Sequence, residues 1–261
     1  MSYNVNLPFL PNRTAKPRNT GLTMVMDKGI SLRQAEDMVS SSGELIDFVK
    51  LGFGTSVVSN NLKEKIKLYQ NANIKVYLGG TLFEAFVVRN KFEEYIEFIK
   101  SLGADSAEVS DGSINIDHGK KCEYISRLAK NFTVLSEVGS KEEGVIIHPA
   151  RWIKMMQAEL DAGSQKVIAE ARESGNVGIF HKNGSAHTLL INRITAKIKM
   201  ENIIWETPQK AQQVYFLKLF GSNVNVGNIA VDDVIPLETL RLGLRGDTFF
   251  TFLPENLKET T

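Results

Sequence analysis

The chain has 261 residues, of which 43% are hydrophobic and 23% are charged, and 31 basic side chains nearly balance 30 acidic ones. This is the composition of a folded globular protein, which excludes an extended disordered chain. The net charge of +1 argues against binding to nucleic acid or to an anionic membrane, because both need a strong basic excess. We therefore expect small-molecule anions as partners.

The sequence lacks the features expected of a secreted or membrane-spanning protein. The first residues lack the basic segment and apolar run of a signal peptide, and no stretch approaches the ~18 apolar residues of a membrane span. The single cysteine, Cys122, cannot form an internal disulfide, which suits a reducing compartment. We expect a cytoplasmic protein and leave a homo-oligomer open.

Eight short runs of strand-forming residues alternate with longer amphipathic segments along the chain. The runs begin near Gly21, Phe48, Lys75, Ala107, Thr133, Lys166, Ile203 and Asn223. The spacing predicts helices over 31–43, 60–72, 81–103, 117–131, 149–163, 186–198, 208–220 and 231–243. A repeat of roughly 30 residues is typical of one strand, one crossover helix and two short loops.

Eight such units can close into an α/β protein of the (β/α)8 TIM barrel type, with a doubly wound open sheet as the competing arrangement. The count of eight favours the barrel, and no Gly-x-Gly-x-x-Gly turn follows the first run. No Pro/Ser-rich linker interrupts the series. We therefore predict a single barrel domain over residues 1–261, with a short N-terminal extension and a frayed C-terminal tail over 254–261.

Acidic residues recur where the predicted strands end, which is where barrel enzymes place their functional groups. Glu108 and Glu137 lie in the fourth and fifth runs, and Glu170 and Glu206 end the sixth and seventh. A charged side chain in an apolar run is costly unless it is paired or binds a metal. Lysines and arginines share the same rim, so the pattern predicts a metal ion beside an anionic substrate. Hard oxygen ligands favour Mg²⁺, because the four histidines are too scattered for zinc.

Glycines follow three of the predicted strands. They are Gly52 and Gly54 after the second run, Gly79 and Gly80 after the third, and Gly227, with Asn228, after the eighth. A glycine there lets backbone N–H groups approach an anion, whereas a tight turn also favours glycine for steric reasons. For one turn alone the tight turn is the favoured interpretation, whereas three such turns on one face strengthen the case for an anion site.

Several strings resemble those of the phosphosulfolactate synthase family. They are Lys16-Pro-Arg18, Lys50-Leu-Gly-Phe-Gly-Thr55, Gly79-Gly-Thr-Leu-Phe-Glu84, Glu137-Val-Gly139, Glu170-Ala-Arg-Glu-Ser-Gly175, Trp205-Glu-Thr-Pro208 and Leu244-Arg-Gly-Asp-Thr248. The resemblance extends from Lys16 to Thr248. It implies a (β/α)8 barrel that acts as a carbon–sulfur lyase or synthase. Such an enzyme adds sulfite to phosphoenolpyruvate with Mg²⁺ and forms (2R)-phospho-3-sulfolactate, the reaction that opens coenzyme M biosynthesis in methanogens.

The resemblance also suggests a role for individual residues. It makes Glu108, Glu137 and Glu170 the expected Mg²⁺ ligands, and Lys50 or Lys141 the expected proton donor. The residues expected to bind the phosphate, carboxylate or sulfite groups are Arg18, Lys28, Arg172 and Arg245. The family commonly continues its Glu-Val-Gly string with lysine, whereas Ser140 stands before Lys141 here. Whether Lys141 preserves the donor therefore stays open.

Two other functions also stay open. The resemblance reaches plant heat-stress-associated proteins, so a non-catalytic, stress-associated barrel is one alternative. The other is a different Mg²⁺-dependent lyase or isomerase of a phosphorylated acid, because barrel folds host many reactions. An activity assay with and without magnesium separates the three hypotheses.

Overall fold

Eight parallel strands form a closed barrel in chain order in the computed structural model, which describes residues 3–139, 148–171 and 174–258. The strands are β1 (Thr23–Asp27), β2 (Phe48–Leu51), β3 (Lys75–Leu78), β4 (Ser106–Val109), β5 (Thr133–Val138), β6 (Lys166–Ala169), β7 (Ile203–Glu206) and β8 (Val226–Ile229). Each strand pairs with the next, and β8 pairs with β1. The predicted (β/α)8 barrel is confirmed, and the competing open sheet is excluded.

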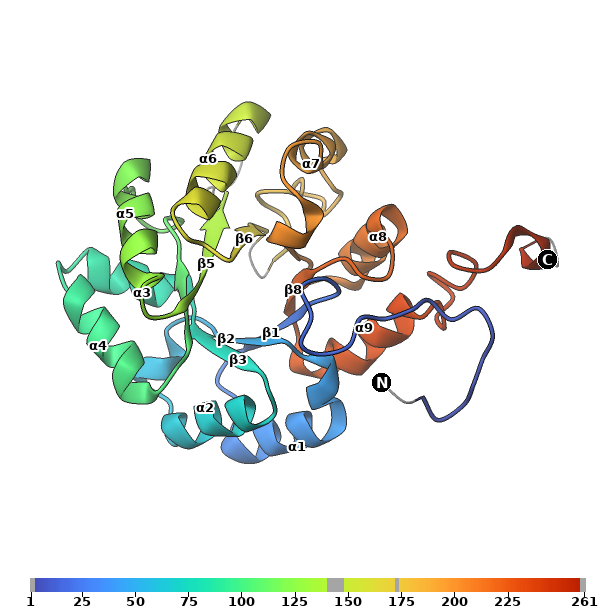
Figure 1. Cartoon of the computed structure of the whole chain (residues 1–261), viewed down its shortest axis with the longest axis horizontal. Coiled ribbons are helices and arrows are strands. Elements are labelled where there is room, and N and C mark those ends of the chain that lie inside the picture. The colour runs from blue at the N-terminus through green and yellow to red at the C-terminus, as the bar shows by residue number, and fades with distance from the viewer. Residues whose placement is uncertain (1–2, 140–147, 172–173, 259–261) are drawn as a thin grey trace.

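Helices surround this barrel, as Figure 1 shows. They are α1 (Leu32–Ser42), α2 (Leu62–Asn71), α3 (Gly80–Val87), α4 (Phe92–Leu102), α5 (His118–Leu128), α6 (Pro149–Asp161), α7 (Thr188–Thr195), α8 (Lys210–Phe220) and α9 (Val234–Arg241). Within the described ranges, no helix combines the length and the apolar character that crossing a bilayer requires. The N-terminal and C-terminal segments extend together beyond α9 (Figure 1).

The third crossover holds two helices where the sequence predicted one over 81–103. The chain turns between α3 and α4 at Asn90, whose φ of 55° is left-handed, a conformation that asparagine tolerates better than most residues. Phe83 on α3 packs edge to face against Phe92 and Tyr95 on α4. The break therefore lets both helices bury aromatic side chains in one cluster.

The eighth strand begins later than the predicted start near Asn223. The side chain of Asn225 occupies the position before the strand, where its Oδ1 accepts the Leu22 N–H at 3.0 Å and its amide donates to the Ile203 carbonyl at 3.1 Å. Strand pairing starts only at Val226. Gly227 and Asn228 consequently lie inside β8, and the prediction that they follow it is wrong.

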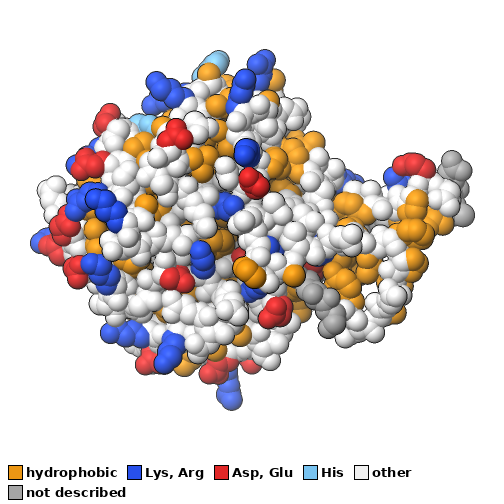
Figure 2. All heavy atoms as spheres, viewed as in Figure 1, with side chains coloured by type: hydrophobic (Ala, Val, Ile, Leu, Met, Phe, Trp, Pro, Cys, Tyr) orange, Lys and Arg blue, Asp and Glu red, His pale blue; other side chains and the backbone are white. Residues whose placement is uncertain are grey.

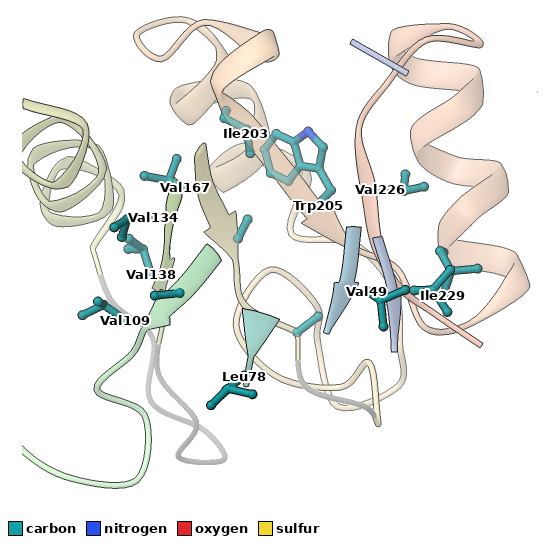
Figure 3. Close-up of a cluster of buried hydrophobic side chains, with 14 of the residues drawn as sticks. Val49, Leu78, Val109, Val134, Val138, Val167, Ile203, Trp205, Val226 and Ile229 are labelled. Atoms are coloured by element: carbon teal, nitrogen blue, oxygen red, sulfur yellow. The ribbon is translucent and has the colours of Figure 1, made fainter. Parts of the chain in front are cut away.

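Side chains along each strand alternate between two environments, because successive residues of a strand point to opposite faces. Outward side chains such as Val49, Val167 and Trp205 pack against the helices (Figure 3). The inward set fills the barrel and consists of Leu22, Met24, Phe48, Tyr77, Leu135, Ile168 and Ile204. Four charged residues each lie two positions after an inward residue: Lys50 after Phe48, Glu137 after Leu135, Glu170 after Ile168 and Glu206 after Ile204. The alternation therefore directs those four side chains to the carboxyl-end mouth of the barrel.

The two terminal segments pack against each other through apolar side chains. Leu7 and Phe9 line one pocket together with Phe252 and Leu257, and Figure 2 shows hydrophobic surface over this projecting part of the molecule. Within the tail that we expected to fray, Glu255–Leu257 forms a short 3-10 helix. The N-terminal extension is thus anchored next to the end of the chain.

Candidate active site

A pocket of about 420 Å³ opens at the carboxyl end of the barrel. Its lining comprises Met26, Lys50, Phe53, Gly79, Gly80, Thr81, Glu108, Ser113, Glu137, Glu170, Ser174, Glu206 and Asn228. Four of these residues are glutamates, from β4 to β7, and Lys50 on β2 is the one cation among them. Within the described lining, the formal charge is therefore strongly negative.

Lys50 lies at the centre of this acidic cluster. Its Nζ is 3.1 Å from Glu108 Oε2, 3.3 Å from Glu137 Oε2 and 3.5 Å from Glu206 Oε1, and all four side chains are buried. Burial opposes the ammonium charge, but the three carboxylates outweigh it and raise the pKa of Lys50 well above its ordinary value. Lys50 is therefore protonated and positively charged among the glutamates of the pocket.

Three of the glutamates are arranged as a candidate metal site. Glu137, Glu170 and Glu206 each place one carboxylate oxygen within 4.8 Å of the others. The second oxygen of Glu206 accepts the Ala171 N–H at 2.9 Å, which fixes the orientation of that carboxylate. Hard oxygen ligands suit Mg²⁺, and three carboxylate oxygens this close together suit a divalent cation. The residues present therefore fit the ion that the sequence predicted.

The membership of this trio differs from the predicted set of ligands. Glu108, which we expected to bind the metal, uses Oε1 to accept the Gly80 N–H at 2.8 Å and Oε2 to meet Lys50. Glu206 takes the third place instead. The sequence offered a signal for Glu206, since it ends its strand and lies two residues after the inward-facing Ile204.

Glu84 on α3 holds one wall of the pocket and was not among the predicted site residues. Its buried carboxylate accepts the Gly112 N–H at 3.1 Å and the Ser113 N–H at 2.6 Å, and it also bonds the Ser110 hydroxyl. These bonds shape the loop after β4, which brings Ser113 into the lining. Glu84 thus acts on the site through backbone rather than by direct contact.

A second buried ion network supports β5 from behind. Lys121 is fully buried and donates to the Glu137 carbonyl at 2.6 Å. Its ammonium also lies 2.9 Å from both Asp111 and Glu159. Burial opposes the charged form, but Glu159 and Asp111 together raise the pKa of Lys121 above its ordinary value. This network fixes the strand end from which Glu137 reaches the pocket.

The paired glycines after β3 line the pocket, but their amides are already used. The Gly79 N–H donates to the Leu51 carbonyl at 2.9 Å, and the Gly80 N–H donates to Glu108. The prediction that these amides face an anion is therefore wrong. The site requires glycine at position 80, because a Cβ there would lie only 2.6 Å from Glu108 Oε1.

The remaining glycines do not line the pocket. Gly52 donates to the Asp27 carbonyl, Gly54 starts a short 3-10 helix with a φ of 65°, and a Cβ on Gly227 would lie 2.5 Å from Met24. These positions are explained by turns and close packing. Asn228 does line the pocket, and among the described residues its buried Oδ1 has no hydrogen-bond partner. Asn228 is therefore the member of this group best placed to bind substrate.

The structure distributes the predicted cations widely. Arg18 lies at the amino end of the barrel, where its Nε is 2.9 Å from Asp47, so its placement on the rim is wrong. Lys28 is exposed just after β1 and outside the pocket lining. Arg245 follows α9. Burial raises the pKa of Asp233, and the positive charge of the nearby Arg245 opposes that rise. Lys141 and Arg172 lie outside the described residues.

Gly178→Ala should displace Glu170 and lower turnover by at least about 10-fold. Gly178 has a φ of 62°, and a Cβ there would lie 1.9 Å from the Glu170 carbonyl oxygen, which accepts the Ile179 N–H at 3.0 Å. The control is Gly103→Ala, because Gly103 has a similar φ of 72° with no atom within 4 Å of its Cβ position. That variant should lose about 1 to 2 kcal/mol of stability from strain alone, with turnover unchanged in steady-state assays. Equal turnover in the two variants would contradict the contact.

Known proteins similar to this chain fall into one group by sequence. A family model described as (2R)-phospho-3-sulfolactate synthase (ComA) matches residues 11–247. The phosphosulfolactate synthase of Methanocaldococcus jannaschii is 45% identical over 237 residues, covering 88% of this chain and 94% of the relative. That of Methanothermobacter thermautotrophicus is 42% identical over 244 residues, covering 91% and 95%.

More distant similarities are also present. The protein HEAT-STRESS-ASSOCIATED 32 of Arabidopsis thaliana is 21% identical over 262 residues, covering 88% of each chain. Among solved structures, 3-hexulose-6-phosphate synthase from Salmonella typhimurium matches with a TM-score of 0.54 at 13% identity, covering 86% of this chain and 100% of that one. At this identity, the structural match shows the barrel fold alone.

Proposed function

The chain belongs to the (2R)-phospho-3-sulfolactate synthase family, and from this premise we propose that its barrel mouth joins sulfite to phosphoenolpyruvate with the help of Mg²⁺. The observation that carries the metal part of the proposal is the grouping of Glu137, Glu170 and Glu206. These three carboxylates would hold the ion. A bound Mg²⁺ supplies a Lewis acid that stabilises negative charge on the substrate carboxylate.

The reaction itself needs one new bond and one proton. The sulfur lone pair of sulfite attacks the methylene carbon, C3, of phosphoenolpyruvate, and a C–S bond forms. The π electrons of the C2–C3 double bond move toward the carboxylate, which becomes an enediolate. A proton then adds to C2 and gives (2R)-phospho-3-sulfolactate, and no group leaves. Negative charge therefore accumulates on the carboxylate during the first step.

Residues of this chain have separate tasks in that reaction. Lys50 offsets the charge of Glu108, Glu137 and Glu206, which keeps the acidic cluster ordered before the substrate arrives. Asn228 presents a buried side-chain amide to the pocket and would orient a polar substrate group. Fixed groups of this kind need little reorganisation during the reaction. Lys50 and Lys141 stay the candidate proton donors.

The two alternatives receive less support. A stress-associated protein without catalysis gives no reason for three carboxylates to converge at the mouth of the barrel, where barrel enzymes place their functional groups. The relative of that description is also much more distant than the synthases. A different lyase or isomerase of a phosphorylated acid would use the same cluster, and only product analysis separates it from sulfite addition.

Purified protein is expected to convert phosphoenolpyruvate and sulfite to phosphosulfolactate when Mg²⁺ is present. Product is measured by ³¹P NMR and by mass spectrometry. EDTA should stop the reaction and excess Mg²⁺ should restore it, because the ion would stabilise the negative charge that develops on the substrate carboxylate. Folded protein that forms no product with Mg²⁺ would favour the non-catalytic alternative, and equal turnover in EDTA would remove the metal from the proposal.

Assembly and location remain part of the proposal. We propose a homo-oligomer, since the projecting termini expose several large apolar side chains, among them Val5 at 58%, Phe9 at 56% and Phe249 at 48%. Burying such side chains against a second copy would remove apolar surface from water. A cytoplasmic location stays a prediction.

A further inference from the structure

A second pocket, of about 560 Å³, opens at the amino end of the barrel, opposite the acidic mouth. Its lining comprises Lys16, Pro17, Arg18, Asn19, Leu22, Asp47, Phe48, Asn73, Lys75, Gln165 and Lys166. Four of these residues are cationic, and Asp47 is the one carboxylate among them. We call this cavity the floor pocket. Its charge is opposite in sign to that of the mouth.

The strand period explains why two of the lysines face this cavity. Lys75 precedes the inward-facing Tyr77 by two residues, and Lys166 precedes the inward-facing Ile168 by two. Side chains two apart on a strand share a face. The ammonium groups of β3 and β6 are therefore directed to the same space below the apolar layer of the barrel.

Two of the four cations already have enough acceptors to explain their positions. Lys16 Nζ donates to the Gly43 carbonyl at 2.8 Å and reaches two further carbonyls at the end of α2. Arg18 pairs with Asp47 through Nε and donates to the carbonyls of Thr14 and Leu45. These bonds attach the N-terminal extension to the bottom of the barrel.

Lys75 and Lys166 are paired less completely. Lys75 Nζ donates to Thr133 Oγ1 at 3.0 Å, and Lys166 Nζ donates to the carbonyls of Glu201 at 2.7 Å and Asn19 at 3.4 Å. In the portion of the chain that the structure describes, neither ammonium forms an ion pair with a carboxylate. Burial lowers the pKa of Lys166, Glu201 opposes that effect, and the positive charge of Lys75 adds to it. The two lysines therefore repel each other across the pocket.

We propose that the floor pocket binds a small tetrahedral oxyanion of the phosphate or sulfate class, held between Lys75 and Lys166. Each ammonium has three N–H donors, so both lysines keep donors for an anion beyond their present bonds. An anion between them would turn their mutual repulsion into two charge-assisted hydrogen bonds. Asn19 and Gln165 line the same cavity, and each has a side-chain amide that can donate to an anion.

The test is a titration of ¹⁵N-labelled full-length protein with inorganic phosphate, followed by NMR at constant ionic strength. The backbone amide signals of Asn19 and Gln165 report on the floor pocket, and those of Gly79 and Gly80 report on the mouth. We expect saturable shifts at Asn19 and Gln165. Lys75→Met and Lys166→Met should each weaken this binding by about tenfold, the loss of one charge-assisted bond.

Two further variants separate binding from folding and from charge. Lys67→Met removes the same charge from the exposed side of α2 and should leave the floor signals and their saturation unchanged. Lys75→Gln is neutral but keeps a donor for Thr133, so weak phosphate binding in this folded variant would support the proposal. Shifts that rise linearly without saturation, or that persist equally in both pocket variants, would overturn it. The NMR titration measures phosphate binding and not turnover, so its result tests the floor pocket independently of sulfite addition.

Discussion

Glu206→Gln is expected to lower kcat/KM for sulfite addition by at least about 100-fold while leaving the fold intact. One oxygen of Glu206 accepts the Ala171 N–H, and the other faces Lys50. Glutamine can keep its oxygen on Ala171. Its NH₂ group would then replace the anionic oxygen beside Lys50, which removes a carboxylate from the candidate trio and places a donor beside an ammonium.

Steady-state kinetics across a range of Mg²⁺ concentrations check this prediction. The variant should need far more Mg²⁺ to reach its maximal rate, because two carboxylates hold the ion less tightly than three. Glu97→Gln is the matched control, since Glu97 on α4 is 71% exposed and pairs with Lys100 on the same helix. A Glu206→Gln enzyme with the turnover and Mg²⁺ dependence of the control would remove Glu206 from the site.

Lys50→Met is expected to abolish most activity and to reduce the free energy of unfolding by about 3 to 5 kcal/mol in the absence of Mg²⁺. The variant leaves Glu108, Glu137 and Glu206 buried without the ammonium that they share. These three carboxylates would repel one another, and protonation of one of them would relieve part of that repulsion. Mg²⁺ should restore part of the lost stability, because the ion replaces the missing positive charge next to the same oxygens.

Urea unfolding with and without Mg²⁺ measures this effect, with unchanged m-values required for the comparison. Lys65→Met provides the control, since Lys65 is also buried and lies 2.8 Å from Asp27, outside the pocket lining. It should lose stability to a similar degree, but added Mg²⁺ should not compensate for the missing Lys65 charge. Equal stabilisation of the two variants by Mg²⁺ would show that the ion does not act at the Lys50 cluster.

The barrel and much of its mouth could be predicted from the sequence because both depend on periodic features. Repeating strand and helix patterns indicate the fold, and alternation within strands places Lys50 and Glu137 inside the mouth. The assignment of Glu108, rather than Glu206, as a metal ligand stays a prediction, and the candidate trio in the structure consists of Glu137, Glu170 and Glu206. Sequence spacing does not reveal which carboxylate oxygens approach one another, nor that Glu108 accepts the Gly80 N–H and meets Lys50.

The prediction for Arg18 was wrong because it assigned the residue to the wrong end of the barrel. It precedes the first strand, and in a parallel barrel a residue just before a strand lies at the amino end. The family resemblance nevertheless placed it with the substrate. Its partner Asp47 likewise precedes β2, so a stricter use of strand polarity would have assigned the pair to the floor of the barrel.

The supporting residues had no usable sequence signal. Glu84 reaches the loop after β4 from α3, and Lys121 reaches the Glu137 carbonyl from α5. Such contacts depend on how each crossover helix packs against the barrel. A lysine on a helix is normally expected to be exposed, whereas Lys121 is fully buried in an ion network.

Anomalous diffraction from crystals grown with Mn²⁺, which accepts the same hard oxygen ligands as Mg²⁺, tests the metal site most directly. The result we predict is one strong peak coordinated by Glu137, Glu170 and Glu206, with oxygen distances of about 2.1 Å. A fully ordered mouth without a peak, or a peak held elsewhere on the protein, would contradict the assignment of these three carboxylates.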